Sequence, residues 1–431
     1  MTKVAALQED ETWTALSQWL PSRNFDCDYW WQLTGRHLAK LLQAAGYSDS
    51  KQHEALVFHY HWIVPYLGPA PCSAVTWRSF LGVEGSPIEY SWKWNKAGGE
   101  PEVRYTIEAI DHFSGTALDP LNQHSSRELL HRLDEVASYS NLSLANHFFA
   151  TLYDHDTSKY VDEAQSGTHH STTIMIAAEL VREGREGYMF KTYFIPRLLG
   201  QADGQLPLSK WEDSFAKLHP VSVARTRLHE FLADSHAGKS LKPFMVAVDN
   251  ISPESSRLKW YFQTLSTSFA SVREVMTLGG RITISESQLQ DLRDLIATTL
   301  NLPANYPDDA EIPSSPTYDP LAKDNFAEFP ELLSAYLYYF DIPPDANLPA
   351  IKFYIPVRRY GKNDLSIARG VMSWMEARGR GAYCHRFLAT LENISQHRQL
   401  SNKAGLQAYL DITSYVGAEA FDPARLASKL S

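Results

Sequence analysis

The sequence predicts an α+β fold in which antiparallel β-hairpins alternate with α-helices. Runs in which apolar and polar residues alternate occur in pairs, and helical patterns separate one pair from the next. The order of helix, hairpin and helix then recurs along the chain. No period of about 20 to 50 residues shows residue-level similarity, which argues against a solenoid. The recurrence is therefore one of architecture alone.

The N-terminal region, about 65 residues long, is expected to be mainly helical. Apolar residues fall at helical spacing in 13–20 and 30–45, and Gly46 is a suitable helix stop. Helical patterns also separate the later strands, and they cover residues 126–139, 208–234 and 286–300.

Three hairpins and two further strands follow the N-terminal region. The hairpins pair 86–95 with 102–110, 172–180 with 188–195, and 244–248 with 257–263, and the further strands cover 351–357 and 407–415. Residues 301–320 are rich in proline and aspartate but have strand and helix signals on both sides, so we expect a long internal loop. The whole chain, 1–431, is predicted to be one domain.

The charge balance excludes two classes of partner. With 40 basic and 50 acidic residues the formal net charge is −10, so no overall field attracts nucleic acid or an anionic membrane.

The start of the chain, MTKVAALQEDETW, has acidic residues where a signal peptide needs a basic start and an apolar run. We therefore expect a cytoplasmic protein. Cys27, Cys72 and Cys384 are isolated in sequence, which argues against structural zinc.

A basic residue followed two positions later by tyrosine recurs on three predicted strands. The pairs are Lys191 and Tyr193, Lys259 and Tyr261, and Lys352 and Tyr354. Arg257 extends the same face of its strand, and apolar residues occupy the opposite faces. One such face alone is typical of a solvated strand surface. Three such faces indicate that the basic and tyrosine side chains all point to one side of a single sheet. In a closed barrel that side is the lumen.

This combination of side chains suits one class of ligand. Arginine and lysine bind phosphate oxygens, and tyrosine rings stabilise a carbocation by cation–π attraction. A prenyl diphosphate combines an anionic leaving group with an incipient cation. On another strand, Glu89 shares a face with Ser91 and Lys93. It is either a surface residue paired with Lys93, or a lumenal carboxylate that accepts a hydrogen bond from an indole N–H and assists proton loss.

The sequence resembles the fungal indole prenyltransferases related to dimethylallyltryptophan synthase, over roughly residues 30–415. The motifs that carry the resemblance are Leu67-Gly68-Pro69, Ser79-Phe80-Leu81, Gly85-Ser86-Pro87-Ile88-Glu89-Tyr90-Ser91, Asp119-Pro120-Leu121-Asn122-Gln123, Lys191-Thr192-Tyr193-Phe194 and Ser256-Arg257-Leu258-Lys259-Trp260-Tyr261. The resemblance implies a ten-stranded antiparallel β-barrel with helices outside, the ABBA prenyltransferase barrel, in which both substrates bind at the centre.

The resemblance also implies roles for particular residues. Glu89 looks like the catalytic glutamate that holds the indole N–H. The residues that resemble the diphosphate cradle are Arg104, Lys191, Arg257, Lys259 and Lys352. The tyrosines that resemble the shield around the allylic cation are Tyr193, Tyr261, Tyr354, Tyr409 and Tyr415. Leu81 and Phe244 are expected to line the pocket for the aromatic acceptor.

Two departures from the family pattern affect the expected substrate and mechanism. Where tryptophan-using members have an arginine for the substrate carboxylate, this chain has Pro243-Phe244-Met245. Loss of that charge partner favours a neutral, tryptophan-containing cyclic dipeptide over free tryptophan. Where some members have a lysine proposed to transfer a proton, this chain has Ala178-Glu179-Leu180. Proton removal then depends on Glu89, water or another group.

The predicted reaction is a Friedel–Crafts alkylation of the indole ring by dimethylallyl diphosphate. Fixed positive charges replace a metal ion, so no cofactor is expected. Asp308-Asp309-Ala310-Glu311 only approximates the DDxxD motif that holds magnesium in isoprenyl diphosphate synthases. Two alternatives stay open at this point: prenylation of free tryptophan, tyrosine or another aromatic, and a barrel that binds a small molecule without turnover. The sequence does not decide whether the protein is a homodimer.

Overall fold

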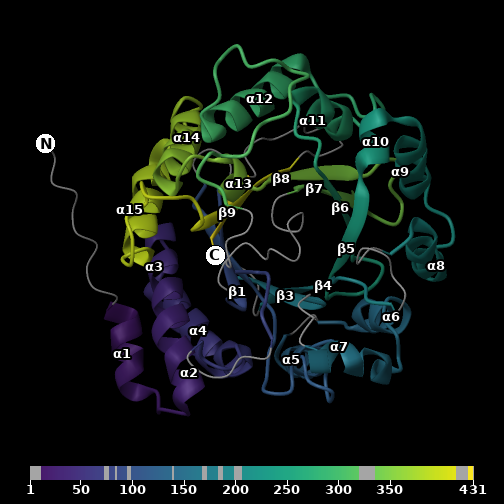
Figure 1. Ribbon diagram of the computed structural model, residues 1–431. Helices are drawn as coiled ribbons and strands as arrows, with labels where there is room; N and C mark the ends of the chain where they lie inside the picture. Colours follow the sequence, from purple (N-terminus) through teal and green to yellow (C-terminus); the bar gives the residue numbers. More distant parts are fainter. Residues whose placement is uncertain are drawn as a thin grey trace, which may run out of the picture.

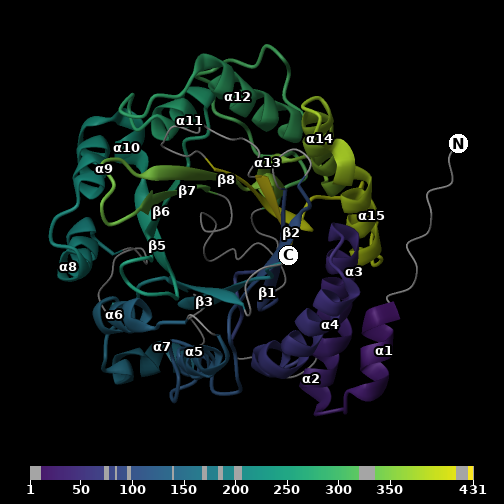
Figure 2. The same cartoon turned by 180° about the vertical axis from the view of Figure 1, so that it is seen from behind.

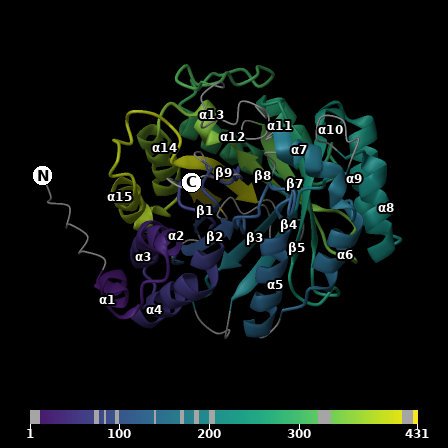
Figure 3. The same cartoon turned by 60° about the horizontal axis from the view of Figure 1, so that its bottom comes forward.

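The computed structural model describes residues 11–71, 77–82, 85–94, 99–137, 140–166, 172–182, 188–198, 206–319, 335–413 and 426–430. In this part of the chain the strands form a closed antiparallel barrel, and helices surround it (Figures 1 and 2). Helices from distant parts of the sequence, such as α3 (Arg36–Ala45) and α9 (Val223–Asp234), stand on opposite sides of the barrel (Figure 3). The prediction of antiparallel strands enclosed by helices is confirmed.

Each strand of the barrel pairs with the strands on either side of it. The strands are β1 (Ile88–Lys93), β2 (Glu102–Ile107), β3 (Ile174–Glu179), β4 (Met189–Phe194), β5 (Lys242–Asp249), β6 (Leu258–Thr264), β7 (Tyr336–Ile342), β8 (Ala350–Ile355), β9 (Gln407–Thr413) and β10 (Leu426–Leu430). Their order around the barrel is β1-β10-β9-β8-β7-β6-β5-β4-β3-β2, and β2 pairs with β1.

Sequence reasoning missed two of these strands and extended several others past their observed ends. β7 and β10 were not predicted, because β7 is apolar or aromatic on both faces and β10 is only five residues long. The strand predicted over 351–357 ends at Ile355, and the short helix α13 (Val357–Tyr360) follows. The strand predicted over 407–415 is observed to Thr413, and residues 414 and 415 lie outside the described residues.

The predicted N-terminal helices are observed. They are α1 (Glu11–Trp19), α2 (Phe25–Trp30), α3, and α4 (Asp49–Phe58), with π-helical segments at Trp31–Gly35 and His59–Ile63 and a 3-10 turn at Val64–Tyr66. The side chain of Asn24 caps α2, and that of Ser48 caps α4. Gly46 ends α3 with a φ of 79°, a left-handed conformation that glycine adopts without strain. The helix stop predicted at Gly46 is thus confirmed.

The remaining helices cover the outside of the barrel. They are α5 (His124–Val136), α6 (Ser143–Thr151), α7 (Val161–Ser166), α8 (Leu208–Leu218), α9, α10 (His236–Ser240), α11 (Phe269–Met276), α12 (Glu286–Leu300), α14 (Asp364–Glu376) and α15 (Cys384–Ile394), with 3-10 turns at Thr157–Tyr160 and Gly381–Tyr383. The single helix predicted over 208–234 is wrong. Pro220 lacks a backbone N–H, and the helix breaks there into α8 and α9.

Two separate apolar clusters hold the fold together. The larger one lies between the outward faces of the strands and the helices, and it includes Trp92, Trp260, Tyr336 and Tyr338, each completely buried. The smaller one contains inward-facing residues, among them Tyr261 and Met175. No helix of the described residues is long and apolar enough to span a bilayer.

Candidate active site

Strand direction sorts the lumenal side chains into layers. Strands β4, β6 and β8 run in the same direction, because each is separated from the next by one antiparallel strand. The repeated order of a basic residue and then a tyrosine therefore places the basic residues in one layer and the tyrosines in the next. The neighbouring strands β5, β7 and β9 run in the opposite direction and bring three aspartates into the charged layer. These aspartates are Asp249, Asp341 and Asp411.

Three of the predicted cradle residues converge on Asp249. Its Oδ2 lies 2.6 Å from the Nζ of Lys259 and 3.8 Å from the Nη2 of Arg257. Its Oδ1 lies 3.7 Å from the Nζ of Lys191. Burial alone would raise the pKa of Asp249, but these three cations lower it below its usual value. For Lys259 the effect of burial exceeds that of the nearby Asp249 carboxylate, so the pKa of this lysine is lowered.

Arg104 joins this group through Glu179. The Nη1 of Arg104 lies 3.5 Å from the Oε1 of Glu179, and Lys191 forms an ion pair with the same oxygen. Burial would raise the pKa of Glu179, but the positive charges of Lys191 and Arg104 outweigh it and hold the pKa well below its usual range. Glu179, singled out in the sequence only because a lysine was expected nearby, is therefore an ionised member of the charged layer.

The other two aspartates, Asp341 and Asp411, contact further cations of the charged layer. Asp341 accepts a hydrogen bond of 2.8 Å from the Nη1 of Arg257, and Asp411 lies 2.9 Å from the Nζ of Lys352. Burial raises the pKa of Asp341, although Arg257 and Lys259 oppose the rise. The five predicted cradle residues thus all face the lumen, and each has a carboxylate within 4 Å.

The tyrosines form an aromatic layer beside the charges. The Tyr261 ring centroid lies 6.1 Å from those of Tyr193 and Tyr354, and 4.9 Å from that of Tyr339. Lys352 links the two layers, because its Nζ lies 5.0 Å from the Tyr354 centroid and 5.8 Å from the Tyr339 centroid. The predicted shield residues Tyr193, Tyr261 and Tyr354 are therefore brought together.

One lumenal aromatic residue was missed by the sequence prediction. Tyr339 was missed, since its strand β7 was not recognised, yet it packs against both Tyr261 and Tyr354. Tyr409 is buried in the same lumenal cluster, as expected. Tyr415 lies outside the described residues. Leu337 and Tyr339 share the lumenal face of β7, but aromatic residues on its other face mask this alternation in the sequence.

Glu89 lies on β1 and faces the lumen. Its side chain is only 5% exposed, and Lys93 instead lies 2.5 Å from Glu102. The alternative of a surface glutamate paired with Lys93 is therefore wrong. Burial, and next the negative charge of Glu89, raise the pKa of Tyr409 above its usual value, so the two side chains are electrostatic neighbours. A carboxylate beside the tyrosine layer can accept a hydrogen bond from an aromatic N–H or O–H.

An apolar pocket wall adjoins the tyrosine layer. Leu81 and Phe244 both pack against the lumenal cluster, and the ring centroids of Phe80 and Phe244 lie 6.3 Å apart. Met175, Met245 and Leu337 belong to the same cluster. The structure thus brings the two predicted acceptor-pocket residues to the lumen, where an aromatic molecule would contact apolar side chains.

The buried carboxylate of Glu108 fixes the position of this pocket wall. Sequence reasoning gave this residue no role. Glu108 is completely buried and accepts hydrogen bonds from Trp77 Nε1, Asn122 Nδ2 and Thr172 Oγ1 at 2.8, 2.8 and 2.6 Å. The hydroxyl of Thr172 in turn accepts a hydrogen bond from the backbone N–H of Phe80. Burial raises the pKa of Glu108 in spite of these donors. Glu108 therefore anchors the segment that carries Phe80 and Leu81.

The three parts of the lumenal site suit three different chemical groups. One layer presents fixed cations to an anionic group, the next presents π-faces to a developing carbocation, and Glu89 lies beside an apolar surface suited to an aromatic ring. Such preorganised charge stabilises a transition state without reorganisation during the reaction. All of these groups point into one enclosed space.

Comparisons with known proteins agree with this arrangement. Residues 26–390 match the family described as tryptophan dimethylallyltransferase. The prenyltransferase anuH of Penicillium roqueforti is 56% identical, over 96% of this chain and 94% of the relative. Xanthone prenyltransferase B of Emericella nidulans is 45% identical, over 96% of this chain and 93% of the relative.

Solved structures share the fold. The structure of AnaPT from Neosartorya fischeri superposes with a TM-score of 0.78 and 22% identity, covering 97% of both chains. That of NotF in complex with brevianamide F and DMSPP gives a TM-score of 0.76 and 20% identity, covering 97% of this chain and 98% of that one.

Proposed function

The chain belongs to the tryptophan dimethylallyltransferase family and is a prenyltransferase, and we propose that it alkylates an aromatic carbon with the dimethylallyl group of dimethylallyl diphosphate, without a metal ion. The observation that carries the proposal is the convergence of Lys191, Arg257 and Lys259 within 4 Å of one lumenal carboxylate, next to a layer of tyrosines. The continuous order of strand neighbours supports a complete ten-stranded barrel formed by a single domain.

In the proposed mechanism, the cations of the charged layer bind the diphosphate. The bond between C1 of the dimethylallyl group and the diphosphate oxygen breaks, and its electron pair leaves with the diphosphate. Tyr193, Tyr261, Tyr339 and Tyr354 shield the allylic cation from water. The π electrons of the acceptor form the new carbon–carbon bond, and loss of a proton restores aromaticity. Glu89 accepts a hydrogen bond from the acceptor and supports this proton loss.

Two acceptor classes are supported by different observations. A tryptophan-containing cyclic dipeptide is supported by the sequence Pro243-Phe244-Met245, which lacks an arginine for a substrate carboxylate. A xanthone-type aromatic, which we propose in a hydroxylated form, is supported by xanthone prenyltransferases A and B of Emericella nidulans, which are 46% and 45% identical to this chain. We favour the hydroxylated aromatic, because these relatives share far more sequence than the neighbours that are only about one-fifth identical. Glu89 can accept from a phenol O–H as it would from an indole N–H.

Product analysis tests the proposal. Purified protein is incubated with dimethylallyl diphosphate and EDTA, together with brevianamide F, free tryptophan or a hydroxyxanthone, and products are identified by mass spectrometry and NMR. We expect carbon prenylation, fastest with the hydroxyxanthone. Faster turnover of brevianamide F would favour the cyclic-dipeptide acceptor, and no product with any aromatic would support the barrel that only binds.

Variants of Glu89 test its role. Glu89→Ala should abolish most turnover while binding of dimethylallyl diphosphate is kept, because Glu89 acts on the acceptor. Glu89→Gln keeps the shape and a hydrogen-bonding oxygen but not the charge, and should retain intermediate activity. Wild-type turnover in the alanine variant would refute the proposed role.

A further inference from the structure

A second cavity lies outside the barrel, against the outward face of β1. It has a volume of about 500 Å³ and is bounded by α3, by the residues that follow α15, and by Ile88 and Tyr90. The helices α3 and α15 lie side by side at this point (Figures 1 and 2). Glu89 faces the lumen from the same strand, so the cavity is on the opposite side of the barrel wall from the acceptor pocket.

The polar lining of this cavity carries one sign of charge. Its basic lining residues are Arg36, His37, Lys40, His397, Arg398 and Lys403. Among the described residues that line it, none is acidic. One of these charges is compensated from outside the cavity, since Arg398 Nη2 lies 2.6 Å from the buried carboxylate of Asp364. No carboxylate among the described lining residues lies with Arg36, His37 and Lys40.

His37 lies among these basic side chains. Its ring is half-buried, with its centroid 6.3 Å from that of Tyr90. Burial, followed by the charges of Lys40, His397 and Arg36, lowers the pKa of His37 to about 4. Lys40 and Arg36 lie on α3 with His37, and His397 lies on the segment that follows α15. Positive groups therefore surround His37 from both sides of the cavity.

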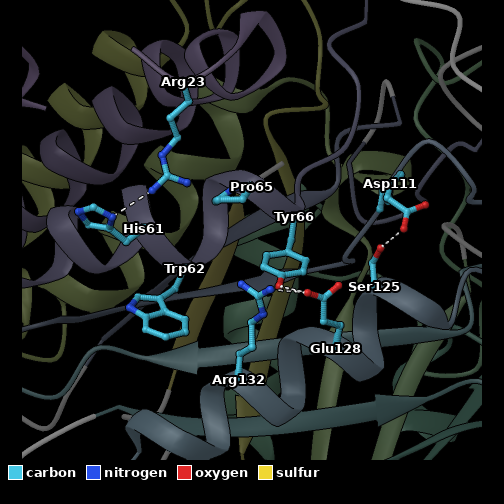
Figure 4. A pocket seen from close by; sticks show the side chains of 10 residues that line it. Arg23, His61, Trp62, Pro65, Tyr66, Asp111, Ser125, Glu128 and Arg132 are labelled. Carbon is cyan, nitrogen blue, oxygen red and sulfur yellow. Dashed lines mark hydrogen bonds and ion pairs between the residues drawn. The ribbon is translucent and has the colours of Figure 1, made fainter. Parts of the chain in front are cut away.

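Another external cavity provides a contrast. It lies beside Tyr66 and α5, and basic and acidic residues line it together (Figure 4). Arg132 lies 2.7 Å from Glu128, and Glu128 also accepts from the hydroxyl of Tyr66. Arg23 contacts His61 at 3.0 Å. Since the carboxylates of Asp111 and Glu128 also line it, this cavity has no comparable preference for an anion.

We infer that the cavity between α3, α15 and β1 binds a small organic anion with an apolar body and a carboxylate or phosphate head. The apolar body contacts Ile88, Tyr90 and Leu406, and the head lies among Arg36, His37 and Lys40. A volume of about 500 Å³ is within the range of small-molecule sites. Guanidinium and ammonium groups donate hydrogen bonds to carboxylate and phosphate oxygens, and so does the N–H of a neutral imidazole.

Calorimetric titration of the full chain tests this inference. The probes are decanoate, decyl phosphate and the neutral decanol, and dimethylallyl thiolodiphosphate is present to saturate the lumen. We expect at least one of the two anions to bind more tightly than decanol by about tenfold, since only an anion interacts with the cations. The tighter anion identifies the head group. Equal binding of decanol and both anions, or no binding of any probe, would overturn the inference.

Matched variants locate the site. Arg36→Gln and Lys40→Gln should each weaken binding of the anion by about fivefold or more. Lys51→Gln is the control, because Lys51 pairs with Glu54 away from the cavity. Lys40 also donates to the backbone of Asn393, so Arg36→Gln is the safer variant if Lys40→Gln fails to fold. Binding that is unchanged in Arg36→Gln and in folded Lys40→Gln would contradict the assignment.

A spectroscopic readout follows the unaltered protein, and a variant serves only to assign one resonance. The anion should raise the pKa of His37 from about 4 by at least about one unit, because a neighbouring negative charge favours the protonated ring. Histidine NMR titrations with and without the bound anion measure this shift, and His37→Gln assigns the resonance. An unchanged pKa of His37 at saturation would contradict the proposal even if the probe binds elsewhere.

Discussion

The carboxylate of Asp249 lies 2.6 Å from the ammonium of Lys259 inside the barrel, and less than a tenth of either side chain is exposed. The two residues lie on neighbouring strands, and Lys191 and Arg257 approach the same carboxylate. The cations that we assign to the diphosphate are therefore already held in place by protein carboxylates. A diphosphate has to compete with these carboxylates when it binds.

Replacement of Lys259 should lower catalysis strongly. Lys259→Gln removes a fixed positive charge from the charged layer, and we expect kcat/KM to fall by roughly a hundredfold or more. Steady-state kinetics with dimethylallyl diphosphate measure the effect. Lys239→Gln, on the exposed end of α10, is the control and should behave like the wild type. A loss below about threefold in Lys259→Gln would show that this lysine does not stabilise the leaving diphosphate.

Replacement of Asp249 should alter stability and diphosphate binding together. Asp249→Asn leaves three cations without their shared carboxylate, and breaking such a buried arrangement costs about 3 kcal/mol or more of unfolding free energy. Inorganic diphosphate then supplies the missing negative charge. We expect diphosphate to raise the melting temperature of Asp249→Asn by more than that of the wild type. Equal shifts in differential scanning calorimetry would show that Asp249 does not organise these cations.

The tyrosine layer should control the fate of the allylic cation. Tyr339→Ala removes the ring that packs 4.9 Å from Tyr261 and 6.1 Å from Tyr354. Water then reaches the cation, so we predict a higher ratio of dimethylallyl alcohol to prenylated product. Chromatography of the products measures this ratio. Tyr339→Phe keeps the aromatic ring and should resemble the wild type, whereas an unchanged ratio in Tyr339→Ala would exclude a shielding role.

His59 should make the protein sensitive to acid. The ring is completely buried, its Nε2 lies 2.7 Å from the Thr34 hydroxyl, and burial lowers its pKa to about 3. A histidine whose pKa is lower in the folded state contributes stability above its unfolded pKa near 6.5, and loses it as the pH falls toward 3. The unfolding free energy should therefore decrease by up to roughly 1 kcal/mol per pH unit from this group.

Chemical denaturation at several pH values tests this dependence. His59→Gln removes the titrating ring, so the variant should lose less stability than the wild type between pH 6.5 and pH 3. Identical slopes for the two proteins would mean that His59 does not contribute to acid sensitivity.

The sequence predicted most of the fold because most strands alternate clearly. Arg257, Lys259 and Tyr261 alternate with apolar residues, and this pattern correctly placed them on one lumenal face. In β7, by contrast, Tyr336 and Tyr338 face the outer core while Tyr339 faces the lumen, so aromatic residues occur on both faces. Alternation is then too weak to identify the strand. The missed Tyr339 follows directly from that ambiguity.

The carboxylates of the charged layer were also beyond sequence reasoning. Asp249, Asp341 and Asp411 lie on strands that run opposite to those of the cations, and each lies near the end of an apolar or aromatic run. Only the register of neighbouring strands brings them beside Lys259, Arg257 and Lys352. Strand pairing depends on contacts between distant segments, and no spacing within a single segment encodes it.

The structure of the complex with dimethylallyl thiolodiphosphate is the most direct test of the central claim. We predict that the diphosphate group lies within about 3.5 Å of the charged nitrogens of Lys191, Arg257 and Lys259, with the dimethylallyl carbons against Tyr261 and Tyr339. A diphosphate bound outside the barrel, or bound inside it without contact to these three residues, would contradict the account.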